Sequence, residues 1–112
     1  MERYRLINAR IELAAQDAVD LEVKLVDLSF NSVRLITALS LHEEQDVLVR
    51  ILTSFSKTLS LKGYVIRVED KAARDGQSVV AIKFHPFSTY DRFNTLDDRK
   101  KLKSIIEKAK TI

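Results

Sequence analysis

Asp27, Ser29 and Ser32 are the side chains whose types and spacing most suggest chemistry. They form the pattern Asp27-x-Ser29-x-x-Ser32, where one alternating apolar segment ends and another begins. A carboxylate accepts N–H hydrogen bonds, and a hydroxyl both accepts and donates them, so the group could hold a polar ligand. Aspartate and serine also bond nearby backbone groups and occur in turns for that reason alone. The segment therefore predicts a turn between two strands, with a binding role left open.

The sequence lacks the residues that most other kinds of functional site require. The sequence has no cysteine, which excludes a disulfide scaffold, an iron–sulfur cluster and a Cys-ligated zinc site. Its two histidines, His42 and His85, have no partners at metal-ligand spacing, so we expect no metal site. Two glycines cannot build a phosphate-binding loop, and no pair of carboxylates is singled out for acid–base work. We therefore predict that the protein is not an enzyme and needs no cofactor.

The positive charge is concentrated near the C-terminus. The formal net charge is +3, and residues 88–112 hold seven Lys or Arg against four Asp or Glu. A basic segment can attract phosphate, or it can simply be the solvated face of a helix. The predicted strands lack the aromatic platform on which single-stranded nucleic acid stacks, so we expect no nucleic-acid polymer as a partner.

Alternating apolar and polar residues predict the strands. Residues 58–69 change phase at Gly63, which predicts a bulge or bend there. Asp75-Gly76 predicts the turn of a hairpin, and Pro86 ends the last strand because it has no N–H to donate. The candidate strand segments are 7–13, 21–25, 33–35, 47–52, 58–69 and 79–85.

The pattern changes to a helical period after Asn94. Thr95 is the expected N-cap, Asp98 suits the positive end of the helix dipole, and lysines gather towards the C-terminal end. The predicted helix runs from about Thr95 to Ala109. Its apolar face, which we expect to pack on the strands, contains Leu102, Ile105, Ile106 and Ala109.

Together these elements predict a single, mainly β domain over residues 1–112. The expected fold is a six-stranded antiparallel barrel at about 6–86 with a C-terminal α-helix at about 95–110. No run of apolar residues reaches the ~18 that a membrane span needs, and no secretory signal is visible. We therefore expect a cytoplasmic protein.

The Asp27 segment resembles the second motif of the PilZ family, Asp/Asn-x-Ser-x-x-Gly, and the length and the barrel-then-helix order match as well. The resemblance implies a bacterial regulatory domain of cyclic di-GMP signalling with a PilZ-like β-barrel. Family members that bind the nucleotide combine this turn with an Arg-x-x-x-Arg pair just before the first strand. Guanidinium groups pair with phosphate or a guanine edge and stack on purines, and the carboxylate accepts guanine N–H groups. The candidate cyclic di-GMP residues are Arg3, Arg5, Asp27, Ser29 and Ser32.

Two departures from the family pattern shape the expected function. No two of Arg3, Arg5 and Arg10 have the four-residue spacing of the family's arginine pair. Arg3 or Arg5 lies where the family has the second arginine of that pair, so the first arginine would precede Met1. Ser32 stands where the family has glycine. We therefore expect weak or absent direct nucleotide binding and action through contacts with a protein partner, as in motility or type IV pilus systems. The alternative is a genuine cyclic di-GMP receptor that uses Arg3/Arg5 with Asp27-x-Ser29, with Arg10 or Arg34 replacing the missing arginine.

Overall fold

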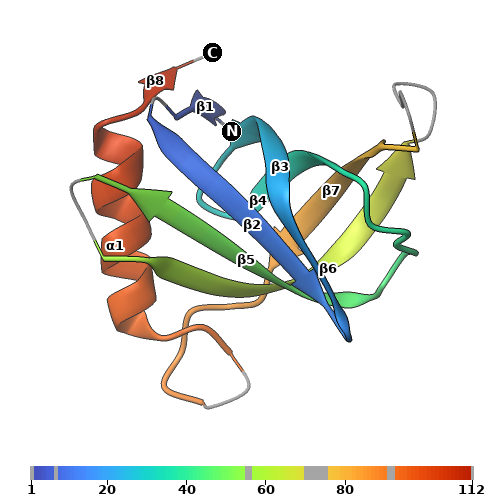
Figure 1. Ribbon diagram of the computed structural model, residues 1–112. Helices are drawn as coiled ribbons and strands as arrows, with labels where there is room; N and C mark the ends of the chain where they lie inside the picture. Colours follow the sequence, from blue (N-terminus) through green and yellow to red (C-terminus); the bar gives the residue numbers. More distant parts are fainter. Residues whose placement is uncertain (1, 7, 55–56, 70–75, 91–92, 112) are drawn as a thin grey trace.

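The fold consists mainly of antiparallel strands (Figure 1). The computed structural model describes residues 2–6, 8–54, 57–69, 76–90 and 93–111. Within these ranges the chain order is β1 (Tyr4–Arg5), β2 (Ala9–Ala15), β3 (Ala18–Leu28), β4 (Ser32–Thr37), β5 (Asp46–Thr53), β6 (Leu59–Glu69), β7 (Ser78–Phe84), α1 (Leu96–Glu107) and β8 (Lys110–Thr111).

Six of the strands close into a barrel. The hydrogen-bonded order is β2-β5-β6-β7-β4-β3, and a further β2–β3 pairing joins the two ends of that series. Each pairing in the ring is antiparallel, so the predicted six-stranded antiparallel barrel is confirmed. The Asp75-Gly76 turn predicted between β6 and β7 lies partly outside the described residues, although Gly76 has the positive φ (77°) typical of such a turn.

Two short strands extend the barrel beyond its predicted limits. Tyr4 of β1 pairs with Leu28 at the end of β3, and β1 also pairs with β8. The chain is therefore already ordered as a strand before residue 6, where the barrel was expected to start. At the other end, Lys108 is the C-cap: its N–H donates to the Ile105 carbonyl oxygen at 3.2 Å, and the Ala109 N–H donates to the Ile106 carbonyl oxygen at 3.0 Å. The helix thus ends at Glu107, before the predicted limit of about 110, because Lys110–Thr111 pair with β1 instead.

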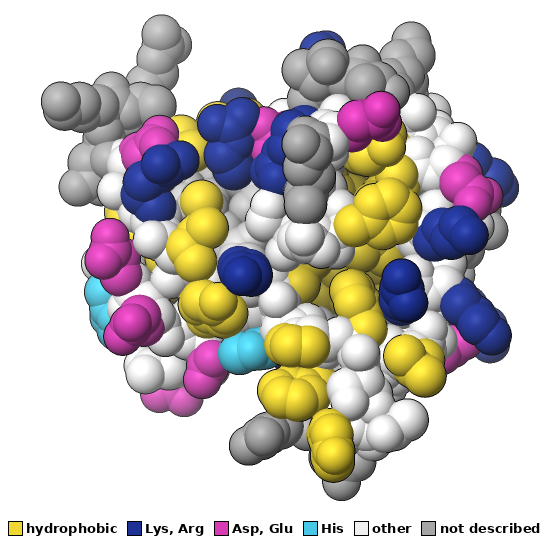
Figure 2. Space-filling model, turned by 180° about the vertical axis from the view of Figure 1, so that it is seen from behind, with side chains coloured by type: hydrophobic (Ala, Val, Ile, Leu, Met, Phe, Trp, Pro, Cys, Tyr) yellow, Lys and Arg dark blue, Asp and Glu magenta, His cyan; other side chains and the backbone are white. Residues whose placement is uncertain are grey.

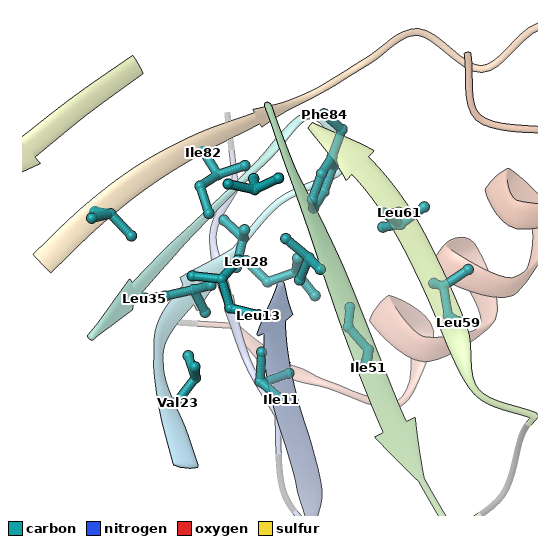
Figure 3. Packing of buried hydrophobic residues seen from close by; sticks show 14 of the residues in the cluster. Ile11, Leu13, Val23, Leu28, Leu35, Ile51, Leu59, Leu61, Ile82 and Phe84 are labelled. Carbon is teal, nitrogen blue, oxygen red and sulfur yellow. The ribbon is translucent and has the colours of Figure 1, made fainter. Parts of the chain in front are cut away.

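Alternate side chains of the strands fill the barrel, and the helix extends the same core. Figure 3 shows Ile11, Leu13, Leu35 and Ile51 gathered inside the ring of strands, with Leu59 and Leu61 of β6 nearer the helix. Leu102, Ile105 and Ile106 of α1 are buried in this cluster, and α1 packs against β6. Three of the four residues predicted on the apolar face therefore dock the helix, whereas Ala109 lies beyond the end of the helix and is only partly buried.

Gly63 has a different role from the one that the sequence suggested. Leu59, Leu61, Gly63 and Val65 are all buried on the same side of β6, and the register with β7 shifts only between Val65 and Arg67. A Cβ atom at Gly63 would lie 2.7 Å from the backbone carbonyl oxygen of Lys83. The irregularity therefore lies at Ile66, three residues after Gly63. The glycine is needed because β7 approaches its backbone closely.

The start of the helix matches the prediction, whereas its charge pattern differs. Thr95 is the N-cap, and its hydroxyl accepts from the Asp98 N–H at 3.0 Å while the Asp98 carboxylate accepts from the Thr95 N–H at 3.0 Å. This is a complete capping box, a stronger role for Asp98 than an interaction with the dipole alone. The last helical turn contains no basic residue, because Lys108 and Lys110 lie beyond the helix. Among the described residues, no helix is long and apolar enough to cross a membrane.

We predict that Ile105→Ala lowers the free energy of unfolding by about 2–4 kcal/mol, because the side chain is 1% exposed in the shared core. Urea denaturation followed by circular dichroism measures the loss. Ser104→Ala, at an exposed position next to it on the helix, is the control and should change the stability little. A loss below about 0.5 kcal/mol for Ile105→Ala would contradict docking of the helix through this face.

Candidate functional site: an aspartate bound by two arginines

The β3–β4 hairpin brings Asp27, Ser29 and Ser32 together. Leu25 pairs with Leu35, but Asp27 pairs with Arg34, so β3 has one extra residue between these pairs. Such a bulge redirects the side chains that follow it. Asp27 and Leu28 are consequently both buried although they are neighbours in the strand. The bulge thus places a carboxylate at the edge of the core, with 2% of the residue exposed.

The predicted turn is present, and Ser29 organises it. The Ser29 N–H donates to the Ser32 carbonyl oxygen at 2.8 Å. The Ser29 hydroxyl oxygen accepts from the backbone N–H of Asn31 (3.3 Å) and of Ser32 (3.2 Å). None of residues 29–32 has a positive φ. The backbone here does not need the family's glycine, which explains how Ser32 is accommodated.

Arg3 reaches this turn from the N-terminal segment. Its Nε donates to Asp27 Oδ1 at 2.8 Å, and its Nη2 donates to the same oxygen. Its Nη1 donates to the hydroxyl oxygens of Ser29 (3.0 Å) and Ser32 (2.6 Å). The pairing of Tyr4 with Leu28 puts Arg3 within reach. One guanidinium therefore contacts all three polar side chains of the Asp27-x-Ser29-x-x-Ser32 pattern.

Arg34 completes the site, although the family resemblance predicts it only as one of two replacements for the missing arginine. Its Nε donates to Asp27 Oδ2 at 2.8 Å, and its Nη2 donates to the same oxygen. Asp27 and Arg34 are directly opposite each other in the hairpin. Counting outward from the predicted turn at Phe30-Asn31 gives this cross-strand pair, so a signal for Arg34 was present in the sequence.

The hydrogen bonds leave the Asp27 carboxylate fully occupied. A carboxylate offers about four acceptor positions. The two arginines donate four N–H groups to it, two to each oxygen. The Asp27 side chain is 3% exposed, against 27% for Arg3 and 42% for Arg34. The three charges sum to +1, so the site is a cationic surface built around a buried anion.

The electrostatics of the site favour the ionised carboxylate. Burial alone would raise the pKa of Asp27, but the hydrogen bonds and charges of Arg34 and Arg3 outweigh it, and the pKa lies below its ordinary value. The hydrogen bond to Asp27 in turn raises the pKa of Arg34. Asp27 is therefore charged throughout the physiological pH range.

Arg5 is the predicted site residue that the structure leaves apart. It is exposed in β1, where it pairs with Lys110 of β8. Arg3, Asp27, Ser29 and Ser32 thus form the cluster, and Arg5 lies on the adjoining strand. The two histidines lie elsewhere. His42 is exposed with its Nδ1 3.0 Å from the Glu43 carbonyl oxygen, whereas His85 Nε2 lies 3.2 Å from Asp46 Oδ1. Among the described residues, no three His, Asp or Glu side chains gather as metal ligands.

The fold has a counterpart among solved structures. No family model and no curated protein matches the sequence. The structure "Bacillus subtilis Inhibitor of motility (MotI/DgrA)" is similar, with a TM-score of 0.62 and 12% sequence identity over 95% of this chain. The fold is PilZ-like. The match covers 48% of the neighbour's chain, so this protein corresponds to about half of that molecule.

We predict that Asp27→Asn lowers the free energy of unfolding at pH 7 by about 2–3 kcal/mol, because charge-assisted hydrogen bonds to two arginines are weakened. Asp27 stabilises the folded state above its unfolded pKa of about 3.9. This contribution is lost as the pH falls through the lower pKa of the folded state. The difference between wild type and variant should therefore shrink below about pH 4. Urea melts from pH 7 to pH 2.5 measure it.

Asp97→Asn is the matched control, because Asp97 is an exposed carboxylate with a single ion pair to Lys101. It should cost less than about 1 kcal/mol. Asp20 also has a lowered pKa, since bonds from Ala38, Glu22 and Thr37 outweigh its burial, and it adds acid sensitivity common to all three proteins. An Asp27→Asn difference that is independent of pH would contradict the assignment.

Proposed function

We propose that the protein is a non-enzymatic, PilZ-like regulatory module that acts through protein contacts, with weak or absent direct binding of cyclic di-GMP. The observation that carries the proposal is the occupancy of Asp27. Both carboxylate oxygens already accept two arginine N–H groups each. The residue that would read a guanine edge is instead part of an internal ion cluster.

Nucleotide binding at Asp27 would require this cluster to open. A guanine N–H group can reach the carboxylate only after Arg3 or Arg34 has withdrawn. Hydrogen bonds to charged groups contribute roughly 1.5–3 kcal/mol each, so each lost bond lowers the affinity at least about tenfold. The Ser29 hydroxyl is committed as well, since it accepts from Arg3 and from two backbone N–H groups. These costs favour a structural role for the motif.

Motility or type IV pilus control is the pathway that we propose for the module. The support is the shared fold of the Bacillus subtilis inhibitor of motility and the resemblance of the Asp27 segment to PilZ proteins. Because the neighbour's chain is about twice as long, the proposal takes from it only the general process, motility, and not its specific activity. A protein partner in such a system is part of the proposal.

A genuine cyclic di-GMP receptor is the second candidate, and one observation favours it. Arg3, Asp27, Ser29 and Ser32 are already assembled, and the guanidinium groups of Arg3 and Arg34 are partly exposed. In this alternative Arg3 and Arg34 would turn towards the phosphates, and Arg5 would approach from the adjoining strand.

We predict that calorimetric titration of the folded protein with cyclic di-GMP gives no measurable heat, or a dissociation constant weaker than about 100 μM. The reason is the occupied carboxylate. A sub-micromolar dissociation constant would overturn the proposal. The receptor alternative also predicts that Arg3→Ala, Arg5→Ala, Asp27→Ala and Ser29→Ala abolish the heat and that added salt weakens it. Arg50→Ala is the control, because Arg50 pairs with Glu12 and is not among the candidate nucleotide residues.

A further inference from the structure

A surface groove beside the Asp27 cluster combines an apolar floor with a basic wall. Phe30 at the tip of the β3–β4 turn and Leu96 at the start of α1 line it together with Arg99, Lys100 and Lys103. Its volume is about 550 Å³. A smaller hollow of about 250 Å³, lined by Phe30, Asn31, Phe87 and Arg99, adjoins it through Phe30 and Arg99. Figure 2 shows hydrophobic side chains gathered on one face of the molecule with Lys and Arg side chains beside them.

The apolar residues of this groove are exposed at some cost. Phe30 is 39% exposed and Leu96 is 48% exposed. Phe30 is also held in place, because Ser29 organises the turn and the Phe84 N–H donates to the Asn31 carbonyl oxygen at 2.8 Å. A large apolar side chain fixed at the surface, with basic residues at its edge, is typical of an interaction site.

The basic wall has no acidic counterpart in the groove. Within the described part of the chain, the linings contain three cations and no Asp or Glu, and Arg99, Lys100 and Lys103 form no ion pair. Lys101, by contrast, lies outside these linings and pairs with Asp97 at 3.4 Å. The unpaired charges are thus confined to the side of α1 that borders Phe30. Complementarity requires an occupant with negative charge as well as an apolar anchor.

We infer that this groove, hereafter the Phe30 groove, binds an acidic segment of a partner protein, one that inserts an apolar side chain beside Phe30 and Leu96 and places carboxylates against Arg99, Lys100 and Lys103. The inference rests on the proposed function, because it names the surface and the chemistry of the protein contact. It also gives the Asp27 cluster a purpose: the cluster holds the turn that presents Phe30.

The test uses nuclear magnetic resonance of the full ¹⁵N-labelled chain with synthetic helical peptides as probes. Each peptide of about 14 residues carries two leucines four apart, flanked by glutamates, in several spacings. We expect amide shifts at the groove residues and binding that weakens with added salt. Matched peptides with serine for leucine, or glutamine for glutamate, should each bind about tenfold more weakly or worse.

Protein variants locate the contact. The double variant Lys100→Glu/Lys103→Glu should weaken peptide binding about tenfold or more, and Phe30→Ser about fivefold or more. Lys101→Glu, the matched charge reversal outside the groove, should stay within about twofold of wild type. Unchanged amide spectra away from each substitution verify that the variants are folded.

Four results would overturn the inference: no shifts in the groove at millimolar peptide, equal binding of the serine peptides, equal weakening by Lys101→Glu, or concentration-dependent self-association that Phe30→Ser abolishes. The first three results would leave the proposed function intact if calorimetry detects no binding of cyclic di-GMP, because the partner would then bind another surface. Tight cyclic di-GMP binding would refute the proposed function whatever the peptides show.

Discussion

The contact on which this structure depends is the buried Asp27 carboxylate with an arginine on each oxygen. An isolated buried charge is unstable, and here two guanidinium groups neutralise it and fill its acceptor positions. One arginine comes from the N-terminal segment and the other from the opposite strand of the hairpin. The carboxylate therefore joins three parts of the chain, and removing it would leave two cations facing each other at the barrel edge.

The consequences of this contact extend through neighbouring elements. Arg3 anchors the segment that forms β1, and β1 pairs with β8, which follows the helix. Arg3 also bonds the two serines of the turn, whose tip carries Phe30. The same motif residues that resemble a nucleotide site thus hold the start of β1, which pairs with β8, and the turn that lines the Phe30 groove.

Local patterns in the sequence predicted most of the fold and much of the site. The alternation of apolar and polar residues predicted the six barrel strands, and Thr95 with the spacing of Leu102, Ile105 and Ile106 predicted the helix. These signals could be read from the sequence because they depend on residues that are close together in the chain. The role of Gly63 and the pairing of β1 with β8 could not be predicted, since they depend on a strand approaching from elsewhere in the barrel. Arg3, Asp27, Ser29 and Ser32 follow from the resemblance to the family motifs, whereas Arg34 required the hairpin register. Arg5 was predicted from the same arginine motif and lies exposed on the adjoining strand β1.

The most direct test of this account is to observe the two arginine side chains themselves. In spectra of the ¹⁵N-labelled protein, the Nε–H groups of Arg3 and Arg34 should give resolved, slowly exchanging signals at hydrogen-bonded positions, because both donate to Asp27. These signals should disappear in Asp27→Asn and stay unchanged when excess cyclic di-GMP is added. Rapid exchange of either group in the wild type, or a shift of both on adding the nucleotide, would contradict the account.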